Sequence, residues 1–142
     1  YRLSGEGADK LAVGDEIAVF GIIKNYKGTI EFDAGCTLIP ADTVSSAKIV
    51  ARAYALEEDA QLMGTKTLTG SIASIDTAFS AEYGNITVTI VVGGLNDYAI
   101  QCFRMKGEGA DKLAVGDVIT VTGAIKNYKG TIEFDAGCTF TK

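Results

Sequence analysis

The chain of 142 residues has a formal net charge of −5 and a hydrophobic fraction of 47%, and it contains three cysteines and no histidine. This hydrophobic fraction excludes a disordered chain, and no stretch approaches the roughly 18 apolar residues that a membrane span needs. The acidic balance excludes a general attraction to nucleic-acid phosphates, although a local basic patch remains compatible with it. A structural zinc site usually needs four cysteine or histidine ligands, and this chain has three cysteines and no histidine. We therefore expect no metal and no cofactor.

An internal repeat dominates the sequence. Residues 1–40 align without gaps onto residues 103–142, a shift of 102 positions, and only ten of the forty pairs differ. The segment KNYKGTIEFDAGCT, for example, occurs at residues 24–37 and again at residues 126–139. Such self-similarity predicts two copies of one structural unit.

The differences between the copies alternate along one segment. Positions 16, 18, 20 and 22 differ from their counterparts, while the residues between them, such as Ile17 and Ile119, are identical. A period of two is the side-chain alternation of a β-strand, so the identical residues are predicted to face the core. The outer face of the first copy is the more apolar one, with Ala18, Phe20 and Ile22. We expect the linker helix or a neighbouring domain to cover it, with neutral drift as the alternative.

The first copy, residues 1–40, is expected to be incomplete. By comparison with residues 67–142 it supplies the end of a third strand and the fourth and fifth strands. So few strands cannot bury a core alone. The preferred interpretation is a fragment of a longer tandem array, and the alternative is that another chain supplies the missing strands.

Residues 41–66 predict a linker with one helix at about residues 45–58. Apolar residues form a helical stripe at i, i+1, i+4 and i+7, namely Ile49, Val50, Ala53 and Leu56. Thr43 or Ser45 can cap the start of this helix. The helix should end near Glu58, because the helix dipole disfavours the acidic residues at its C-terminus.

Residues 67–142 predict a complete copy with five short strands. Alternating apolar residues place these strands at 68–72, 86–92, 98–105, 118–126 and 131–135. The turn 127–130 joins the last two strands, and one helical turn is expected around residues 111–113. Five short strands with an insertion between the third and the fourth predict a small barrel.

The complete copy resembles OB-fold domains. LAVGDVITVTG at residues 113–123, followed by GTIEF at 130–134, resembles the fourth and fifth strands of that fold. The fuller pattern comprises residues 49–56, 67–72, 75–79, 83–89 and 100–104. It is similar to OB-like repeats in large secreted or surface-attached proteins of Gram-positive, often gut-dwelling, bacteria. The resemblance implies an all-β fold: a five-stranded OB-like Greek-key barrel with a linker helix, preceded by the C-terminal half of a second barrel of the same type.

OB folds include oligonucleotide binders, oligosaccharide binders and plain spacers. Our first hypothesis is a non-catalytic repeat module of an extracellular or cell-surface bacterial protein, acting as a spacer, adhesion or self-assembly unit. Its partners would be neighbouring repeats or copies of itself, through Ala18, Phe20 and Ile22. We expect no enzymatic activity, because the chain has no histidine that could act as a base beside a serine or cysteine. We also expect no insertion into a membrane.

The alternative hypothesis is an OB module that binds single-stranded nucleic acid or oligosaccharide. Lys126, Tyr128 and Lys129 cluster between the fourth and fifth strands, where OB proteins commonly bind ligands. Aromatic rings can stack on bases or sugars while lysine meets phosphate. The candidate ligand-binding residues are Lys126, Tyr128, Lys129, Tyr83, Phe103 and Arg104, with the repeated cluster Lys24, Tyr26 and Lys27. A hairpin turn with solubilising lysines is the simpler interpretation.

Two carboxylates, Glu133 and Asp135, share one strand face, and Glu31 and Asp33 repeat them. Such a pair could perform acid–base chemistry or hold calcium. A solvated outer strand face explains the same pattern more simply and is the preferred interpretation.

Cys102 and Cys138 are candidates for a disulfide. The OB strand order implies that the third strand runs beside the fifth, which would make these cysteines neighbours. A disulfide would suit a secreted protein, and a pair of buried thiols is equally compatible with the sequence.

Overall fold

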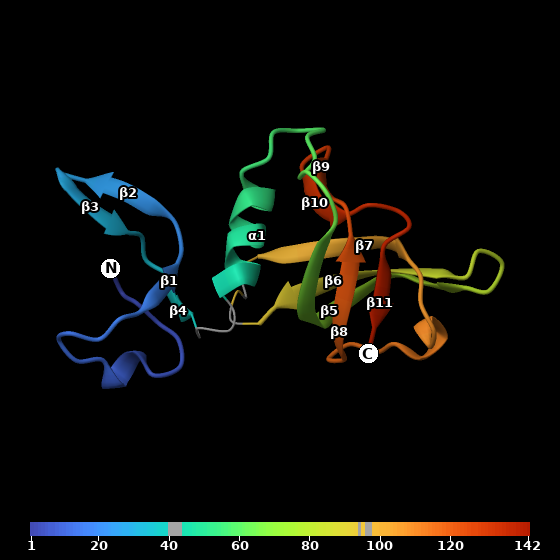
Figure 1. Cartoon of the computed structure of the whole chain (residues 1–142), viewed down its shortest axis with the longest axis horizontal. Coiled ribbons are helices and arrows are strands. Elements are labelled where there is room, and N and C mark those ends of the chain that lie inside the picture. The colour runs from blue at the N-terminus through green and yellow to red at the C-terminus, as the bar shows by residue number, and fades with distance from the viewer. Residues whose placement is uncertain (40–43, 94, 96–97) are drawn as a thin grey trace.

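The computed structural model describes residues 1–39, 44–93, 95 and 98–142, and they are predominantly β-strand. Figure 1 shows the first copy as a small lobe beside helix α1, with the larger lobe of the second copy on the other side of the helix. The expected all-β class is therefore confirmed.

The first copy contains two small antiparallel sheets. Its elements are η1 (Ala8–Lys10), β1 (Ala18–Phe20), β2 (Ile23–Tyr26), β3 (Thr29–Phe32) and β4 (Thr37–Ile39). β1 pairs with β4, and β2 pairs with β3.

Helix α1 spans Val44–Tyr54, which is shorter than the expected range of 45–58. Beyond the helix, Asn127 of the second copy holds the chain: its side-chain amide donates to the Leu56 carbonyl, and its own carbonyl accepts from the Asp59 amide. Ser45 lies within the helix and does not cap it, and Thr43 falls outside the described residues. Ala47, Val50 and Ala53 form the buried stripe. In the part of the chain that is described, no helix has the length and hydropathy of a membrane span.

The second copy forms one seven-stranded sheet. Its elements are β5 (Lys66–Ser80), β6 (Asn85–Val92), β7 (Ala99–Met105), η3 (Ala110–Lys112), β8 (Val118–Gly123), β9 (Ile125–Tyr128), β10 (Thr131–Phe134) and β11 (Thr139–Thr141). The sheet order is β11-β8-β5-β6-β7-β10-β9, in which β7 and β10 are parallel and the other neighbours antiparallel. Within the described residues, these strands do not close into a barrel.

Three features of this sheet differ from the expectation. β5 is much longer than residues 68–72, the expected fourth strand is interrupted at Ala124, and β11 was not expected at all. Close packing beside this interruption requires glycine at position 123, because a Cβ atom on Gly123 would lie 2.8 Å from the Cβ atom of Cys138. The Ala124 carbonyl accepts a hydrogen bond from the Asp135 amide at 2.9 Å, which ties the bend to the end of β10.

The two copies use the same strand registers. Ala18 pairs with Ile39 in the first copy, as Thr120 pairs with Thr141 in the second. The other residue pairs between β1 and β4 recur, shifted by 102 positions, between β8 and β11. The residue pairs between β2 and β3 recur in the same way between β9 and β10. The strand alternation read from the sequence is therefore the same in both copies.

The predicted core face is buried in the second copy only. Ile119, Val121 and Phe134 are almost fully buried, as expected. The prediction is wrong for Ile17, which is 44% exposed, because no strand like β5 lies beside β1 in the described structure. The opposite face of β1 is covered in part: Ala18 and Phe20 pack against the core cluster that includes Ile39, helix α1 and the second copy, while Ile22 is exposed.

The duplicated isoleucines provide a matched stability test. Replacing Ile119, 1% exposed, with alanine should lower the free energy of unfolding by about 2–5 kcal/mol, because a buried cavity forms. Ile17→Ala should cost less than about 1 kcal/mol, because its side chain is already half exposed. Urea unfolding followed by circular dichroism measures both values. Equal losses for the two variants would contradict the burial described here.

Candidate functional site

A hollow of about 440 Å³ lies on the outer face of β7, β9 and β10. Its lining residues are Gln101, Phe103, Lys126, Tyr128, Thr131 and Glu133. Each of the three strands contributes two of these residues, and the two residues of a strand are two positions apart. This is the spacing of side chains on one face of a strand. The pairing registers bring them together, because Glu133 lies opposite Gln101 on β7 and opposite Lys126 on β9.

The charge of Lys126 is compensated inside the site. Its ammonium lies 2.7 Å from Asp135 and 3.6 Å from Glu133. The hydrogen bond between Lys126 and Asp135 raises the pKa of the lysine and lowers the pKa of that carboxyl. Burial raises the pKa of Glu133, and Lys126 offsets only part of this effect. The interpretation of Glu133 as a solvated residue is wrong, since it is only 4% exposed.

The aromatic side chains of the site carry cations on or near their rings. Lys126 and Lys129 lie over the Tyr128 ring, 5.1 and 5.3 Å from its centroid. The two-residue loop that places Lys129 has positive φ angles at Lys129 (49°) and Gly130 (92°), as a tight hairpin turn requires. Arg104 lies over the Phe103 ring at 5.0 Å. The aromatic surface is thus flanked by the cationic side chains of Lys126, Lys129 and Arg104.

A hydrogen-bond network on the neighbouring strands fixes Gln101. Its amide donates to Asp76 at 3.1 Å, and Asp76 also accepts from Ser74 and Thr89, each at 2.7 Å. Burial would raise the pKa of Asp76, but these three hydrogen bonds outweigh it and lower the pKa. Gln101 is therefore held in place by an ionised carboxylate at neutral pH.

Sequence reasoning found half of the lining residues. Lys126, Tyr128 and Phe103 line the hollow, and Lys129 and Arg104 adjoin it through ring contacts. The missed residues Gln101, Thr131 and Glu133 each lie on a strand face that the sequence already predicted. Two-residue spacing from Phe103 would have found Gln101.

Tyr83 does not take part in this site. It lies in the exposed turn between β5 and β6, and it is not among the residues that line the hollow. Figure 1 shows this turn projecting at the far end of the sheet from β9. The sequence analysis assigned Tyr83 to the site because the sequence does not show how far a tyrosine in a loop lies from the residues of other strands.

The repeated cluster of the first copy has the same internal geometry. Lys24 and Lys27 lie over the Tyr26 ring, at 5.5 and 5.3 Å. Lys24 is also paired with Glu31 and Asp33, as Lys126 is with Glu133 and Asp135. No residue of the chain aligns with Gln101 in this copy, so the cluster has only part of the site.

The three cysteines are buried and free. Burial raises the pKa of Cys102 strongly, and the nearby Cys138 raises it further. Burial likewise raises the pKa of Cys138 to about 12. Both are neutral thiols at neutral pH and are poor nucleophiles. Among the described residues, no cluster of three or more His, Cys, Asp or Glu could hold a metal ion.

Comparison with known proteins assigns the chain to no family. No family model matches it, and no curated protein matches it. Its function is therefore inferred from the contacts of its own residues.

The duplicated ion pairs allow a test of the site's electrostatics. Lys126→Met should lower the free energy of unfolding by about 1–3 kcal/mol at pH 7, because Glu133 would remain buried without a cation. The loss should shrink towards about pH 4, because a buried carboxyl with a raised pKa becomes neutral as the pH falls.

Lys24→Met is the matched control for this prediction. The Glu31 side chain is 24% exposed against 5% for Glu133, so the loss should be clearly smaller. Urea unfolding at the two pH values measures both variants. Equal, pH-independent losses would contradict the role of burial.

Proposed function

We propose that the chain is a non-catalytic OB-like repeat module of an extracellular bacterial protein, which serves as a spacer, adhesion or self-assembly unit. The observation that carries this proposal is the packed contact between the first copy and the second. A module of this kind needs its repeats held in a fixed arrangement, and the contact between the two copies provides such an arrangement. The extracellular location rests on the resemblance of residues 113–123 and 130–134 to repeats of secreted proteins.

Three aromatic rings form the centre of this contact. Phe20 of β1 meets Tyr98 edge-to-face, with ring centroids 4.8 Å apart. Tyr98 in turn meets Tyr54 of α1 edge-to-face at 5.0 Å, and the Tyr54 hydroxyl donates to the Ala99 carbonyl. Each such pair contributes about 0.5–1.5 kcal/mol beyond the burial of its area. First copy, helix and second copy are thus joined through one row of rings.

The apolar residues around the rings extend the contact. Ile39 is 7% exposed and belongs to the same core cluster as Val50 of α1. The position of Phe20 is Thr122 in the second copy, where no further repeat packs in the described structure. The difference between the copies therefore falls on the face that meets a neighbour, which supports a role in repeat-to-repeat packing.

The strand order supports the OB-like part of the proposal. β5, β6 and β7 form an antiparallel meander, β7 pairs in parallel with β10, and β5 pairs with β8. Only Ala124 separates β8 from β9, and only residues 135–138 separate β10 from β11. If each of these pairs is taken as one bent strand, five strands follow one another in the order 1-2-3-5-4, and the fourth returns to the first. This is the strand order of an OB-like barrel.

The inter-copy contact can be tested by breaking the row of rings. Phe20→Ala and Tyr98→Ala should each loosen the first copy, so the radius of gyration from small-angle X-ray scattering should increase. A double-mutant cycle should give a coupling of about 0.5–1.5 kcal/mol, because the two rings touch. Ile22→Ala, on the same strand face but exposed, is the control and should change neither quantity. Unchanged scattering with additive losses of stability would contradict a fixed arrangement of the copies.

A second candidate function is binding of a neutral oligosaccharide in the hollow of β7, β9 and β10. The favouring observation is its chemistry: exposed Tyr128 and half-buried Phe103 offer aromatic rings, while Gln101 and Thr131 offer hydrogen bonds. The charge of Lys126 is compensated by Glu133 and Asp135, so this lysine provides little net attraction for phosphate. Sugar is therefore favoured over single-stranded nucleic acid.

A glycan array followed by calorimetric titration tests this second candidate. Tyr128→Ala should weaken binding of the sugar by about tenfold or more, because it removes a stacking surface. Tyr26→Ala, the counterpart in the first copy, should leave binding unchanged. Binding of single-stranded oligonucleotides that falls steeply with salt, without sugar binding, would contradict the choice of ligand.

A further inference from the structure

The first copy exposes an apolar face whose counterpart in the second copy is buried. The exposed fractions of the paired side chains are 44% for Ile17 against 1% for Ile119, 61% for Ile23 against 0% for Ile125, and 69% for Ile30 against 8% for Ile132. The residues and the strand registers are identical in both copies. Only the surroundings differ, so the second copy indicates what would cover this face in the first.

In the second copy the cover is the β5–β6–β7 meander. β8 pairs with β5, which places Ile119 opposite Gly70 and Val121 opposite Leu68. β10 pairs with β7, which places Phe134 opposite Cys102. In the described part of the first copy, β1 pairs with β4 alone and β3 pairs with β2 alone. Each of these two strands therefore has one open edge beside the exposed isoleucines.

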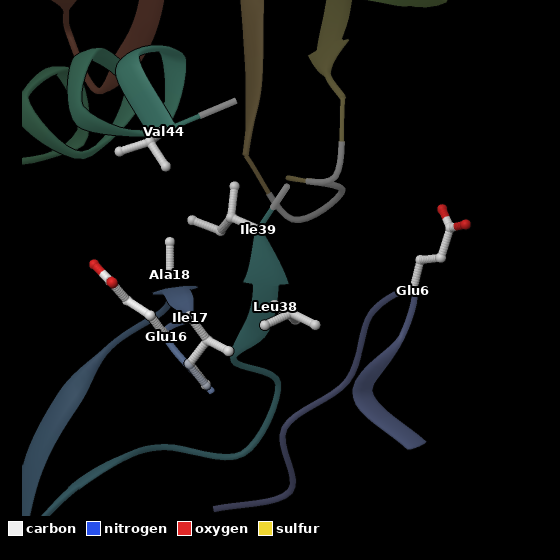
Figure 2. Close-up of a pocket in the computed structure, with 7 residues that line it drawn as sticks. All are labelled: Glu6, Glu16, Ile17, Ala18, Leu38, Ile39 and Val44. Atoms are coloured by element: carbon white, nitrogen blue, oxygen red, sulfur yellow. The ribbon is translucent and has the colours of Figure 1, made fainter. Parts of the chain in front are cut away.

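A hollow of about 910 Å³ lies beside residues 16–18 at the start of β1 and is lined also by residues of β4 and α1. Figure 2 shows its lining residues: Glu6, Glu16, Ile17, Ala18, Leu38, Ile39 and Val44. The counterparts of residues 16–18 are Val118, Ile119 and Thr120, which pair with residues 71, 70 and 69 of β5. The hollow thus borders the place where a strand like β5 would run.

The first residues of the chain make contacts in the first copy that match those made by the end of β7 in the second copy. Ser4 forms a parallel bridge with Thr37, as Lys106 does with Thr139. The Cys36 thiol donates to the Tyr1 carbonyl at 3.5 Å, as the Cys138 thiol donates to the Phe103 carbonyl at 3.7 Å. A strand that continued backwards from Tyr1 would therefore enter beside β3 in the register that β7 has beside β10.

We propose that the open face of the first copy accepts a three-stranded meander of the β5–β6–β7 type, joined to the residue before Tyr1. The amino-acid differences between the copies fit this occupant. Only two of the ten differing pairs lie at buried positions of the second copy, Met105 and Phe140, and the first copy has Leu3 and Leu38 there. The face that the meander contacts is thus apolar in both copies.

The test joins an added copy of residues 67–102 directly to Tyr1 of the full chain, because the shift of 102 makes this junction continuous with the repeat. Hydrogen exchange is followed in the peptide of residues 16–22, whose sequence EIAVFGI is unique to the first copy. Exchange in β1 should slow by about tenfold or more, because its free amides gain strand partners. Fluorescence of a dye that binds apolar surface should fall in parallel.

The matched control is the same fusion with Leu68→Asp and Ile72→Asp in the added segment only. Equal exchange in the two fusions would overturn the proposal. A second outcome would also overturn it: an unfused chain that is a dimer by sedimentation, with the peptide of residues 16–22 already protected. In that case a second copy of the chain, rather than a preceding meander, is the occupant.

A second variant tests the proposal even if the fusion does not fold. In the full chain, the ten differing residues of 103–142 are replaced by those of residues 1–40, so that the existing meander meets the sequence of the first copy. The melting temperature should stay within about 8 °C of the original, as apolar residues replace apolar ones in the core. Loss of the cooperative transition would show that the first copy does not fit such a meander.

Discussion

The pairing of β8 with β5 and of β10 with β7 is the contact on which the second copy depends. These two pairings bury the alternating isoleucines, valines and phenylalanine whose counterparts stay partly or largely exposed in the first copy. Because the strand sequences are almost the same, local propensity cannot explain the difference. A short strand gains its stability from neighbours on both sides, and the meander provides them.

The same alternation that fills the core also builds the candidate site. On β7, Cys102 points inward, so Gln101 and Phe103 point outward, and β9 and β10 contribute outward residues in the same way. The parallel contact of β7 with β10 then brings an amide, two rings and a buried carboxylate to one place. The charge of Lys126, at the centre of the site, is compensated by the carboxylates of Glu133 and Asp135.

The inter-copy contact and the open face lie on opposite sides of β1. Ala18 and Phe20 point towards the helix and the second copy, whereas Ile17 belongs to the open face. Alternate side chains of one strand can therefore pack on two different partners. The side chains on one face contact a neighbouring repeat, and those on the other face belong to the core of the strand's own unit. This division also accounts for the differences along β1, where positions 18 and 20 differ between the copies while Ile17 and Val19 are unchanged.

The sequence by itself determined the equivalence of the two copies, the alternation of Ile119 and Val121, the tight turn at Lys129 and Gly130, and the helix between the copies, because these depend on residues near one another in the chain. Tertiary structure alone decided the end of α1 at Tyr54, the bend at Ala124 and the burial of Glu133. Each of these involves a distant partner, respectively Asn127, Cys138 and strand β7. The exposure of Ile17 is the clearest case, since its identical counterpart Ile119 is buried where β5 lies beside β8.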